Sequence, residues 1–513
     1  MSNQPINLTV AATGRLSLRE SHHNTMQNLP IKLYRGAQVR ELDRIATQER
    51  GIPGFELMSR AGAEVFQCLK KQWPKARSIA VFCGSGNNAG DGYIIAGLAL
   101  AAGLDVCVYA VSDPENLKDD ALAAYRQYTG ANGKIIPFQA GQAVSADVLV
   151  DALLGIGLDR PVTGLYTEAI LAINTLSAPV IAVDIPSGLN ADTGNAMGCA
   201  AKADFTVTFI GLKQGLFTGQ AAEYCGEICY AQLGVPDDVF AGFTATATRI
   251  VKSRLPRRDR GAHKGSCGHV LVVGGDLGYS GAARLAGEAA LRVGAGLVSV
   301  ATRAEHSGLM NLGRPELMCH GVETAEQLSA LLAKANVIVV GPGLGQSVWA
   351  KTLFNAAIAS GKPLVIDADG LNLLANSPST NSGWILTPHP GEAARLLNCA
   401  TTDIQKNRFA AVLSIQAKYG GIAIVKGAGT LIASEQELAV STTGNPGMAS
   451  GGMGDVLAGV IAGLLAQGLS LQEAAQQGVY NHGLAADLAA AKDGERGLLA
   501  SDLMPYLRQL VNV

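Results

Sequence analysis

The sequence lacks any apolar run long enough to cross a membrane, which takes about 20 uninterrupted apolar residues. The nearest candidate, residues 456–465, contains Gly459 and Gly463 and stops before Gln467, so a buried helix is predicted there. The first 30 residues are polar and hold no apolar core beside a cleavage signal, so we expect residues 1–30 to be a mobile extension. These absences predict a soluble, cytoplasmic protein.

The sequence also lacks an excess of charge of either sign. It holds 40 basic and 42 acidic side chains, a formal net charge of −2, which gives no electrostatic reason to expect nucleic acid or an anionic membrane as a partner. A basic stretch at residues 252–261 has no interleaved aromatic side chains, so it is predicted to be a linker or a solvated face. Small-molecule ligands are favoured.

Paired cysteine motifs are missing as well. The nine cysteines are scattered between Cys68 and Cys399 without a CxxC spacing, which indicates a reducing compartment. The closest pair, Cys225 and Cys229, has no second pair or histidine nearby, so ordinary strand or turn packing is expected there rather than zinc.

The chain has 513 residues, which is more than one hydrophobic core usually organises. Of these residues 48% are apolar. Short apolar runs alternate with helical patterns in both halves, which predicts two α/β domains at residues 31–245 and 252–513, each a parallel sheet with helices on both faces. Helices are predicted at residues 93–102 and 118–128. Strands are predicted at residues 78–83, 105–110, 148–152, 180–184 and 205–209, then at 269–273, 297–301, 337–340, 363–367 and 422–426.

Polar groups in the first half gather where predicted strands end. The loop at residues 84–92 is rich in glycine but does not fit the dinucleotide fingerprint GxGxxG, because an Asn-Asn pair and Asp91 interrupt it. Asp151 and Asp184 mark two further strand ends. A buried carboxylate is costly unless it binds a cation, pairs with a charge or transfers a proton, so three on one sheet edge favour a site, although any one of them could cap a helix or turn.

The second half carries its own glycine-rich segments. Residues 426–430, Lys-Gly-Ala-Gly-Thr, follow a predicted strand and suit phosphate and adenosine, but a β-hairpin turn explains them nearly as well. Residues 448–455 supply clustered N–H groups ahead of an apolar helix. Asp455 at its entry is either an N-cap or a base beside an anion hole.

Three more segments of the second half follow predicted strands, at residues 341–345, 367–370 and 387–392. His389 alone would usually be a structural histidine, and Glu392 a carboxylate in the first turn of a helix. In the company of the other segments they favour a second site at strand ends.

The motifs GSGNNAGDG, VDALLGIGLDRPVTG and VDIPSG, in this order, resemble the YjeF N-terminal domain, the epimerase of hydrated NAD(P)H (NAD(P)HX), over residues 33–234. The resemblance implies a Rossmann-like domain that interconverts the R and S forms at C6 of the hydrated ring. It implies potassium held by Asn88, Asp151 and Ser187, and Asp184 as general acid/base, with Asp91 as the alternative. The implied contacts with NAD(P)HX are Asn87, Asn88, Ala89, Gly90, Asp91, Gly155, Ile156, Gly157, Leu158, Asp159, Arg160, Pro161 and Asp184. Ala89 departs from the family, which commonly has glycine there, and its methyl group can narrow the approach of phosphate.

TPHPGE and NPGMASGGMGD, together with residues 279–283 and 291–297, resemble the ribokinase-like, ADP-dependent NAD(P)HX dehydratases over residues 252–510. By that resemblance the hydrate contacts are Ala282, Gly343, His389 and Asp455. The implied ADP contacts are Lys426, Gly427, Ala428, Gly429, Thr430 and Gly454. Met453 replaces the family's common threonine, but the glycines and Asp455 persist.

Together the two resemblances imply a bifunctional repair enzyme, a homo-oligomer acting on NADHX or NADPHX. Phosphorylation of the C6 hydroxyl by ADP with Mg²⁺ would make it a good leaving group, with Asp455 taking the hydroxyl proton. One rival is a small-molecule kinase, whose phosphorylated product would accumulate. The other is a noncatalytic nucleotide-binding protein, for which asparagine would be expected in place of Asp184 or Asp455; both aspartates are present.

Overall fold

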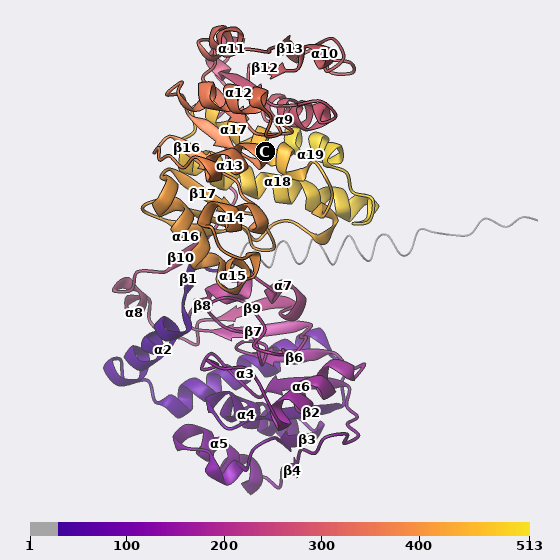
Figure 1. Cartoon of the computed structure of the whole chain (residues 1–513). Helices are drawn as coiled ribbons and strands as arrows, with labels where there is room; N and C mark the ends of the chain where they lie inside the picture. Colours follow the sequence, from indigo (N-terminus) through magenta and orange to yellow (C-terminus); the bar gives the residue numbers. More distant parts are fainter. Residues whose placement is uncertain (1–28, 513) are drawn as a thin grey trace, which may run out of the picture. The chain divides into compact units, whose positions relative to one another are not determined.

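The computed structural model describes residues 29–512, which divide into two compact units, 29–248 and 249–512 (Figure 1). The expected mobile extension lies outside the described residues apart from Leu29, which is buried, and Pro30. None of the helices in residues 29–512 is both long and apolar enough to span a membrane.

The N-terminal unit is built on a parallel sheet with strand order β4-β3-β2-β5-β6-β7-β9. The chain runs outward from β2 to β4 and then returns to β2's other side with β5, so the strand order reverses between β2 and β5. In such sheets ligands bind beyond the carboxyl ends of the strands at this point. The strands are β2 (Ser78–Cys83), β3 (Asp105–Ala110), β4 (Lys134–Pro137), β5 (Val148–Ala152), β6 (Val180–Val183), β7 (Phe205–Phe209) and β9 (Glu227–Ala231).

Helices cover both faces of this sheet because successive strand residues point to opposite sides. Ile79 and Val81 of β2 are buried in one hydrophobic cluster with residues of α3, α4 and α5. Ala80 and Phe82 are buried in another with residues of α6. The helices of the unit are α2 (Gly36–Arg44), α3 (Gly54–Gln72), α4 (Asn87–Ala101), α5 (Asp119–Gly130), α6 (Leu165–Thr175), α7 (Ala221–Tyr224) and α8 (Asp237–Ala241).

A short strand pairing lies beside this sheet. β1 (Lys32–Tyr34) runs parallel to β8 (Leu212–Lys213), with Tyr34 opposite Lys213. The other edge of β1 is antiparallel to β10 (Ala247–Arg249), with Leu33 opposite Ala247.

The C-terminal unit has strand order β13-β12-β11-β14-β15-β16-β17-β18-β19, and its order reverses between β11 and β14. The strands from β13 to β17 are parallel, whereas β17, β18 and β19 form antiparallel pairs. The strands are β11 (His269–Val273), β12 (Leu297–Thr302), β13 (Met318–Gly321), β14 (Val337–Val340), β15 (Leu364–Ile366), β16 (Trp384–Leu386), β17 (Ile422–Val425), β18 (Leu431–Ala433) and β19 (Leu438–Val440).

The strands at the centre of this unit are continuous apolar runs because both faces are covered. Val270 and Val272 of β11 are buried with residues of α9, α17 and α18, and Leu271 and Val273, which point the other way, are also fully buried. The helices are α9 (Ser280–Arg292), α10 (Ala304–Ser307), α11 (Ala325–Leu332), α12 (Val348–Ile358), α13 (Ala368–Asn376), α14 (Pro390–Leu397), α15 (Thr401–Lys406), α16 (Arg408–Tyr419), α17 (Met453–Ala466), α18 (Leu471–Asp493) and α19 (Met504–Leu510).

The expected α/β class and parallel sheets are confirmed, and every predicted strand exists with ends within one residue. Two helix starts were predicted too late. α4 begins at Asn87, so residues 87–91 belong to its first turns rather than to a loop. α17 begins at Met453 with Gly452 as its N-cap, so the alternative that Asp455 is the N-cap is wrong. Of the basic stretch, Ser253 and Arg258 hydrogen-bond to Gln477 and Gln467 of the C-terminal unit.

The crossing of α9 and α17 gives a test of the C-terminal core. A Cβ atom at Gly459 would lie 2.0 Å from the backbone oxygen of Ala286, so the helices must separate to admit it. We expect Gly459→Ala to lower the free energy of unfolding by about 1–3 kcal/mol, despite the better helix propensity of alanine. Gly281→Ala on α9, where an added Cβ meets nothing within 4 Å, is the control. Chemical denaturation measures both, and equal stabilities would contradict the tight crossing.

Candidate active sites

A pocket of about 720 Å³ opens in the N-terminal unit at the carboxyl ends of β2, β5 and β6. It lies at the reversal of strand order, where a ligand is expected. Most of the residues implied as contacts with NAD(P)HX line it, namely Asn87, Asn88, Asp91, Gly155, Ile156, Gly157, Leu158, Asp159, Arg160 and Asp184.

Three implied contacts do not line this pocket. Ala89 is fully buried in the hydrophobic core of the unit, so the concern that its methyl group narrows the approach of phosphate is wrong. Gly90 faces α3 and α5 instead, since a Cβ there would lie 2.6 Å from Met58 and 2.9 Å from Ala121. Pro161 follows the lining segment 153–160 but is outside the lining set.

Asp184 meets a buried lysine at the floor of the pocket. Lys213 is fully buried and donates to Asp184 Oδ1, to Thr208 Oγ1 at 2.9 Å and to the Phe209 carbonyl at 3.1 Å. Asp184 follows β6 with φ at 68°, a left-handed conformation that is uncommon outside glycine, asparagine and aspartate. The Phe209 N–H also donates to its Oδ1, at 3.2 Å. The pair therefore holds a charged carboxylate at the pocket with its orientation fixed.

Two further carboxylates, Asp91 and Asp43, interact electrostatically with this pair. Burial raises the pKa of Asp91 well above its ordinary value, and the charges of Asp184 and Asp43 raise it further while Lys213 opposes them. Burial also raises the pKa of Asp43. For Lys213, burial lowers the pKa and the carboxylates oppose that shift. The pocket thus brings Asp91, whose pKa is raised, close to the ion-paired Asp184, which suits acid–base chemistry.

The sequence analysis missed Lys213 and Asp43. Lys213 lies on β8, where pairing with β1 fixes its position opposite Tyr34. Its signal was a single lysine directly after the apolar run from Phe209 to Leu212, because a lone charge beside such a run is costly without a partner.

The three implied potassium ligands form a separate group beside the pocket. Asp151 accepts hydrogen bonds from the Ser187 hydroxyl at 2.5 Å and the Ser187 N–H at 2.7 Å. Burial raises the pKa of Asp151 to about 6, although these bonds oppose the shift. Asn88 is buried, and its Nδ2 has no hydrogen-bond partner among the described residues. Asp151 and Ser187 therefore lie in direct contact. Asp151 does not line the pocket with Asp91 and Asp184.

A second, partly buried lysine organises the C-terminal unit. Lys426, after β17, donates to Asp367 Oδ1 at 2.8 Å and lies 3.8 Å from Glu392 Oε2. Thr387 Oγ1 donates to the same Asp367 oxygen at 2.8 Å. Burial alone would lower the pKa of Lys426, but Asp367 and Glu392 raise it above its ordinary value. Lys426 thus stays positively charged at the carboxyl ends of the strands.

Asp455 joins this group from the first turn of α17. Burial raises its pKa to about 7, with Asp367 and Glu392 adding to the shift and Lys426 opposing it. A carboxylate with a pKa near neutrality is suited to proton transfer. His482 lies nearby on α18; burial and the charge of Lys426 lower its pKa to about 4, so it is neutral.

Residues 426–430 form the turn of a β-hairpin, because Val425 of β17 pairs with Leu431 of β18. The alternative reading of this segment as a hairpin turn is therefore confirmed, and it does not exclude nucleotide contact. Arg408 of α16, which the sequence analysis missed, holds the turn by donating to the carbonyls of Ala428 and, at 3.1 Å, Val425.

His389 and Glu392 have the structural roles considered for them. His389 is the N-cap of α14: its Nδ1 accepts from the Gly391 N–H at 2.9 Å, and Glu392 accepts from the His389 N–H at 2.8 Å. Both also lie beside Lys426, so the capping places them at the site. Gly343 and Ala282 are brought together, since a Cβ at Gly343 would lie 3.1 Å from that of Ala282.

Two α/β units, each with an ion-paired lysine among carboxylates near the carboxyl ends of parallel strands, define an enzyme with two candidate sites. A family model described as "YjeF-related protein N-terminus" matches residues 54–215, and one described as "NAD(P)H-hydrate dehydratase" matches residues 270–509. A Coxiella burnetii protein named bifunctional NAD(P)H-hydrate repair enzyme Nnr is 51% identical over 94% of this chain and 99% of its own length. The Escherichia coli protein of the same name is 43% identical over 94% and 95%. The chain therefore belongs to the family of bifunctional NAD(P)H-hydrate repair enzymes.

A solved structure is similar to half of the chain. The ADP/ATP-dependent NAD(P)H-hydrate dehydratase from Bacillus subtilis, co-crystallised with ATP/Mg²⁺, is 29% identical. It covers 50% of this chain and 94% of its own, with a TM-score of 0.46.

The Asp184–Lys213 pair can be tested through stability. Lys213→Met leaves Asp184, Asp91 and Asp43 without their buried cation, which we expect to cost roughly 3–5 kcal/mol of unfolding free energy. Adding Asp184→Asn to Lys213→Met removes one stranded charge and should recover part of the loss. Lys202→Met, at an exposed position, is the control. Denaturant unfolding of these proteins and of Asp184→Asn alone completes the cycle, and additive effects of the two changes would mean that the side chains do not interact.

Proposed function

We propose that the N-terminal pocket epimerises NAD(P)HX and that the site around Asp455 dehydrates the S form at the expense of ADP. The observation that carries the proposal is that each unit presents its own acid–base cluster at the reversal point or strand ends of its sheet. The full-length similarity to named bifunctional NAD(P)H-hydrate repair enzymes supports both halves. The chain thus recovers both epimers of a damaged cofactor.

For epimerisation, the bond between C6 and the ring nitrogen breaks, its electron pair goes to the nitrogen, and the C6 hydroxyl becomes a carbonyl; the bond then reforms on the other face. Asp184 serves as the general base that takes the C6 hydroxyl proton as the bond breaks, and its conjugate acid returns that proton to the oxygen as the bond reforms. The buried Lys213 pairs with Asp184 and orients it. Asp91, whose pKa is raised by burial, is the alternative proton donor in the same pocket.

The group of Asn88, Asp151 and Ser187 fits a large monovalent cation. Asp151 is a buried carboxylate whose raised pKa shows that burial outweighs its hydrogen bonds. The side-chain amide of Asn88 is buried and lacks a partner for Nδ2; because its two ends are interchangeable in assignment, an oxygen can occupy that position. One carboxylate with neutral oxygens suits K⁺ better than Mg²⁺, which prefers a small octahedral shell. When bound, K⁺ neutralises Asp151 beside the pocket.

For dehydration, hydroxide is a poor leaving group, so the C6 hydroxyl is first phosphorylated. Asp455 takes the hydroxyl proton as the oxygen attacks the β-phosphorus of ADP, and AMP leaves. Inorganic phosphate then departs from C6 with electrons from the ring nitrogen, and loss of a proton from C5 restores the ring double bond of NAD(P)H. Lys426 and the N–H groups at the start of α17 stabilise the transferred phosphoryl group. The hydrate contacts are Ala282, Gly343, His389 and Asp455, and the ADP contacts are residues 426–430 and Gly454.

Magnesium fits this site as an ion carried by the nucleotide. Among residues 29–512, no group of three or more His, Cys, Asp or Glu side chains is arranged to hold a metal. Mg²⁺ commonly keeps several waters and binds substrate phosphates with only one or two carboxylates. Asp367, Asp455 and Glu392 could supply those, and the ion would neutralise charge on the nucleotide phosphates.

The kinase alternative shares the chemistry of the first step and differs in its product. If the C-terminal site were a small-molecule kinase, a stable phosphorylated compound would accumulate. Incubation of the protein with mixed R and S NADHX, ADP and Mg²⁺, followed by NADH absorbance, separates the two. Recovery of NADH with release of AMP and phosphate supports the dehydratase.

Reciprocal variants assign one aspartate to each activity. We expect Asp455→Asn to lower the dehydration rate at least about a hundredfold while epimerisation continues. Asp184→Asn, which tolerates the same left-handed backbone, should lower epimerisation comparably and leave dehydration of the S form intact. Near-normal dehydration by Asp455→Asn would leave that unit without a base. Loss of epimerisation in Asp91→Asn but not in Asp184→Asn would transfer the role to Asp91.

The pKa of Asp455 predicts a pH profile for dehydration. Since only the carboxylate form accepts a proton and the pKa is raised to about 7, the rate should rise with pH until about 7 and then level off. Steady-state rates with the pure S hydrate between pH 5 and 9 measure this, provided that ADP is saturating. A profile that is flat across this range would separate Asp455 from the proton transfer.

Potassium binding predicts a cation-specific stabilisation of the N-terminal unit. At ten times its Kd, K⁺ should raise the unfolding midpoint of that unit by about 3–6 °C relative to choline at equal ionic strength. Asp151→Asn should abolish the difference. Thermal scans in the two salts give the answer, and equal midpoints for the unaltered protein would exclude the site.

The same assay, run once with NADHX and once with NADPHX, measures which hydrate the protein prefers. The homo-oligomer, the cytoplasmic location and the domain limits 31–245 and 252–513 stay predictions.

A further inference from the structure

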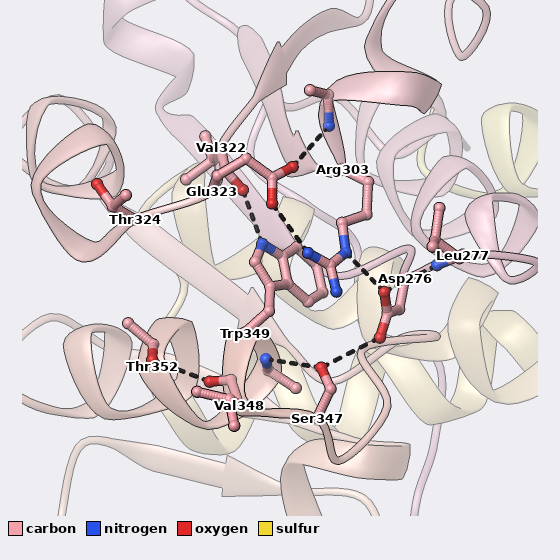
Figure 2. A network of polar contacts seen from close by, with 12 residues as sticks. Asp276, Leu277, Arg303, Val322, Glu323, Thr324, Ser347, Val348, Trp349 and Thr352 are labelled. Carbon is pink, nitrogen blue, oxygen red and sulfur yellow. Dashed lines mark hydrogen bonds and ion pairs between the residues drawn. The ribbon is translucent and has the colours of Figure 1, made fainter.

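A network of charged and aromatic side chains crosses the C-terminal unit beside the proposed hydrate site (Figure 2). At its centre Arg303 donates from Nε to Asp276 Oδ1 at 2.7 Å and from Nη1 to Glu323 Oε2 at 2.8 Å. Its guanidinium lies over the Trp349 ring, 4.2 Å from the centroid. Arginine is suited to this role because it can pair with two carboxylates and stack on an aromatic face at once.

The network joins the ends of four neighbouring strands. Asp276 follows β11, Arg303 follows β12, Glu323 follows β13, and Ser347 lies between β14 and α12. These strands are adjacent in the order β13-β12-β11-β14. Ser347 Oγ donates to Asp276 Oδ2 at 3.3 Å, and the Trp349 indole donates to the Val322 carbonyl at 2.8 Å, as Figure 2 shows.

A single hydrogen bond connects the same network to the residues proposed to contact the hydrate. The Asp276 N–H donates to the Gly343 carbonyl at 2.6 Å. Gly343 in turn is packed so closely that a Cβ there would lie 2.6 Å from the Tyr279 carbonyl and 3.1 Å from Ala282. A displacement of Asp276 therefore moves Gly343 against Ala282.

The ion pairs of Arg303 are partly shielded from water, because Arg303 is 19% and Asp276 16% exposed at the side chain. Burial alone would raise the pKa of Asp276, but its hydrogen bonds with Arg303 and the Leu277 N–H bring it below the ordinary value. Removing the guanidinium would leave the carboxylates of Asp276 and Glu323 without the cation that pairs with both of them.

We propose that Arg303 is a positioning residue for dehydration: it holds the β11 and β14 loops at the spacing the hydrate needs and does not touch the reacting atoms. This inference rests on the proposed placement of the hydrate at Ala282 and Gly343. Misplacement of a bound substrate by about 1 Å can cost on the order of a hundredfold in rate. The hydrate site is therefore sensitive to Arg303, whereas the ADP contacts on β17 and α17 are not.

The test measures KM for both substrates in Arg303→Met and Arg303→Lys. For Arg303→Met we expect KM for the S hydrate to rise about tenfold or more, with KM for ADP within about twofold of the unaltered protein. Arg303→Lys keeps the charge but not the two-sided pairing, so its KM for the S hydrate should lie between those of the unaltered protein and Arg303→Met. Arg314→Met is the matched control, because Arg314 is also partly buried and ion-paired, to Glu288, but lies outside the network.

The outcomes separate this inference from the proposed function. If the unaltered protein does not dehydrate the hydrate, the proposed function fails. If it does, and Arg303→Met shows an unchanged KM for the hydrate or equal rises in both KM values, the positioning role is overturned. Should Arg303→Met fail to fold, Trp349→Leu keeps both ion pairs and removes the stacking, and the same KM comparison applies to it.

A second, independent observation lies in the N-terminal unit. Cys68 of α3 and Cys229 of β9 place their sulfur atoms 3.8 Å apart, and both side chains are partly exposed. The other cysteines within residues 29–512 are free as well. A rotation about the side-chain bonds can bring two sulfurs at contact distance to the 2.05 Å of a disulfide when the Cβ atoms allow it.

We infer that Cys68 and Cys229 form a reversible disulfide on exposure to a peroxide. One thiolate attacks the peroxide oxygen, which gives a sulfenic acid and water; the second thiol then displaces water to form the S–S bond. The two sulfurs lose two electrons in total, and hydrogen peroxide is reduced to two waters. The bond would tie α3, which carries the pocket residues Leu57 and Met58, to the edge strand of the sheet.

Peptide mapping under non-reducing conditions after hydrogen peroxide treatment tests this. We expect one linked peptide pair, Cys68 with Cys229, that is absent in Cys68→Ser and Cys229→Ser, persists in Cys399→Ser and is reversed by dithiothreitol. Cys399 is the exposed control. Oxidation to sulfinic acid without the linked pair, or linkage to other cysteines, would overturn the inference.

Discussion

A lysine paired with a carboxylate at the end of a parallel strand is the interaction on which both candidate sites depend. Lys213 with Asp184 and Lys426 with Asp367 each place a positive charge where several carboxylates converge. Without that charge the convergence would be strongly unfavourable, because like charges in a poorly solvated site repel and are costly to desolvate. With it, one carboxylate in each site can remain ionised while a neighbour has its pKa raised.

The two units reach this arrangement from different local structures. In the N-terminal unit the lysine comes from β8, a short strand outside the main sheet, and the aspartate from a left-handed residue after β6. In the C-terminal unit the lysine begins a hairpin turn and Asp455 lies in the first turn of a helix. The shared feature is therefore the chemistry of the strand ends rather than a repeated motif.

The strands and the glycine-rich segments were predictable from the sequence because runs such as Val337–Val340 are apolar throughout and are bounded by turn residues. The short antiparallel strands β18 and β19, and the edge strands β4 and β9, were not, since three-residue strands carry little periodicity and edge strands include charged residues. Arg303 and Arg408 were missed for a different reason. Each acts through partners far away in sequence, and no local pattern distinguishes such a residue from a surface lysine or arginine.

The pairing of β1 has a consequence for the order in which the polypeptide is made. β1 at residues 32–34 positions β8 and Lys213, yet its other edge pairs with residues 247 and 248 at the far end of the same unit. A ribosome must therefore release nearly the entire first half before this strand has both neighbours. Until then the nascent chain carries the acidic side chains of the pocket without a fixed Lys213 to balance their charge. The last residues of the unit therefore complete the strand pairing that positions Lys213.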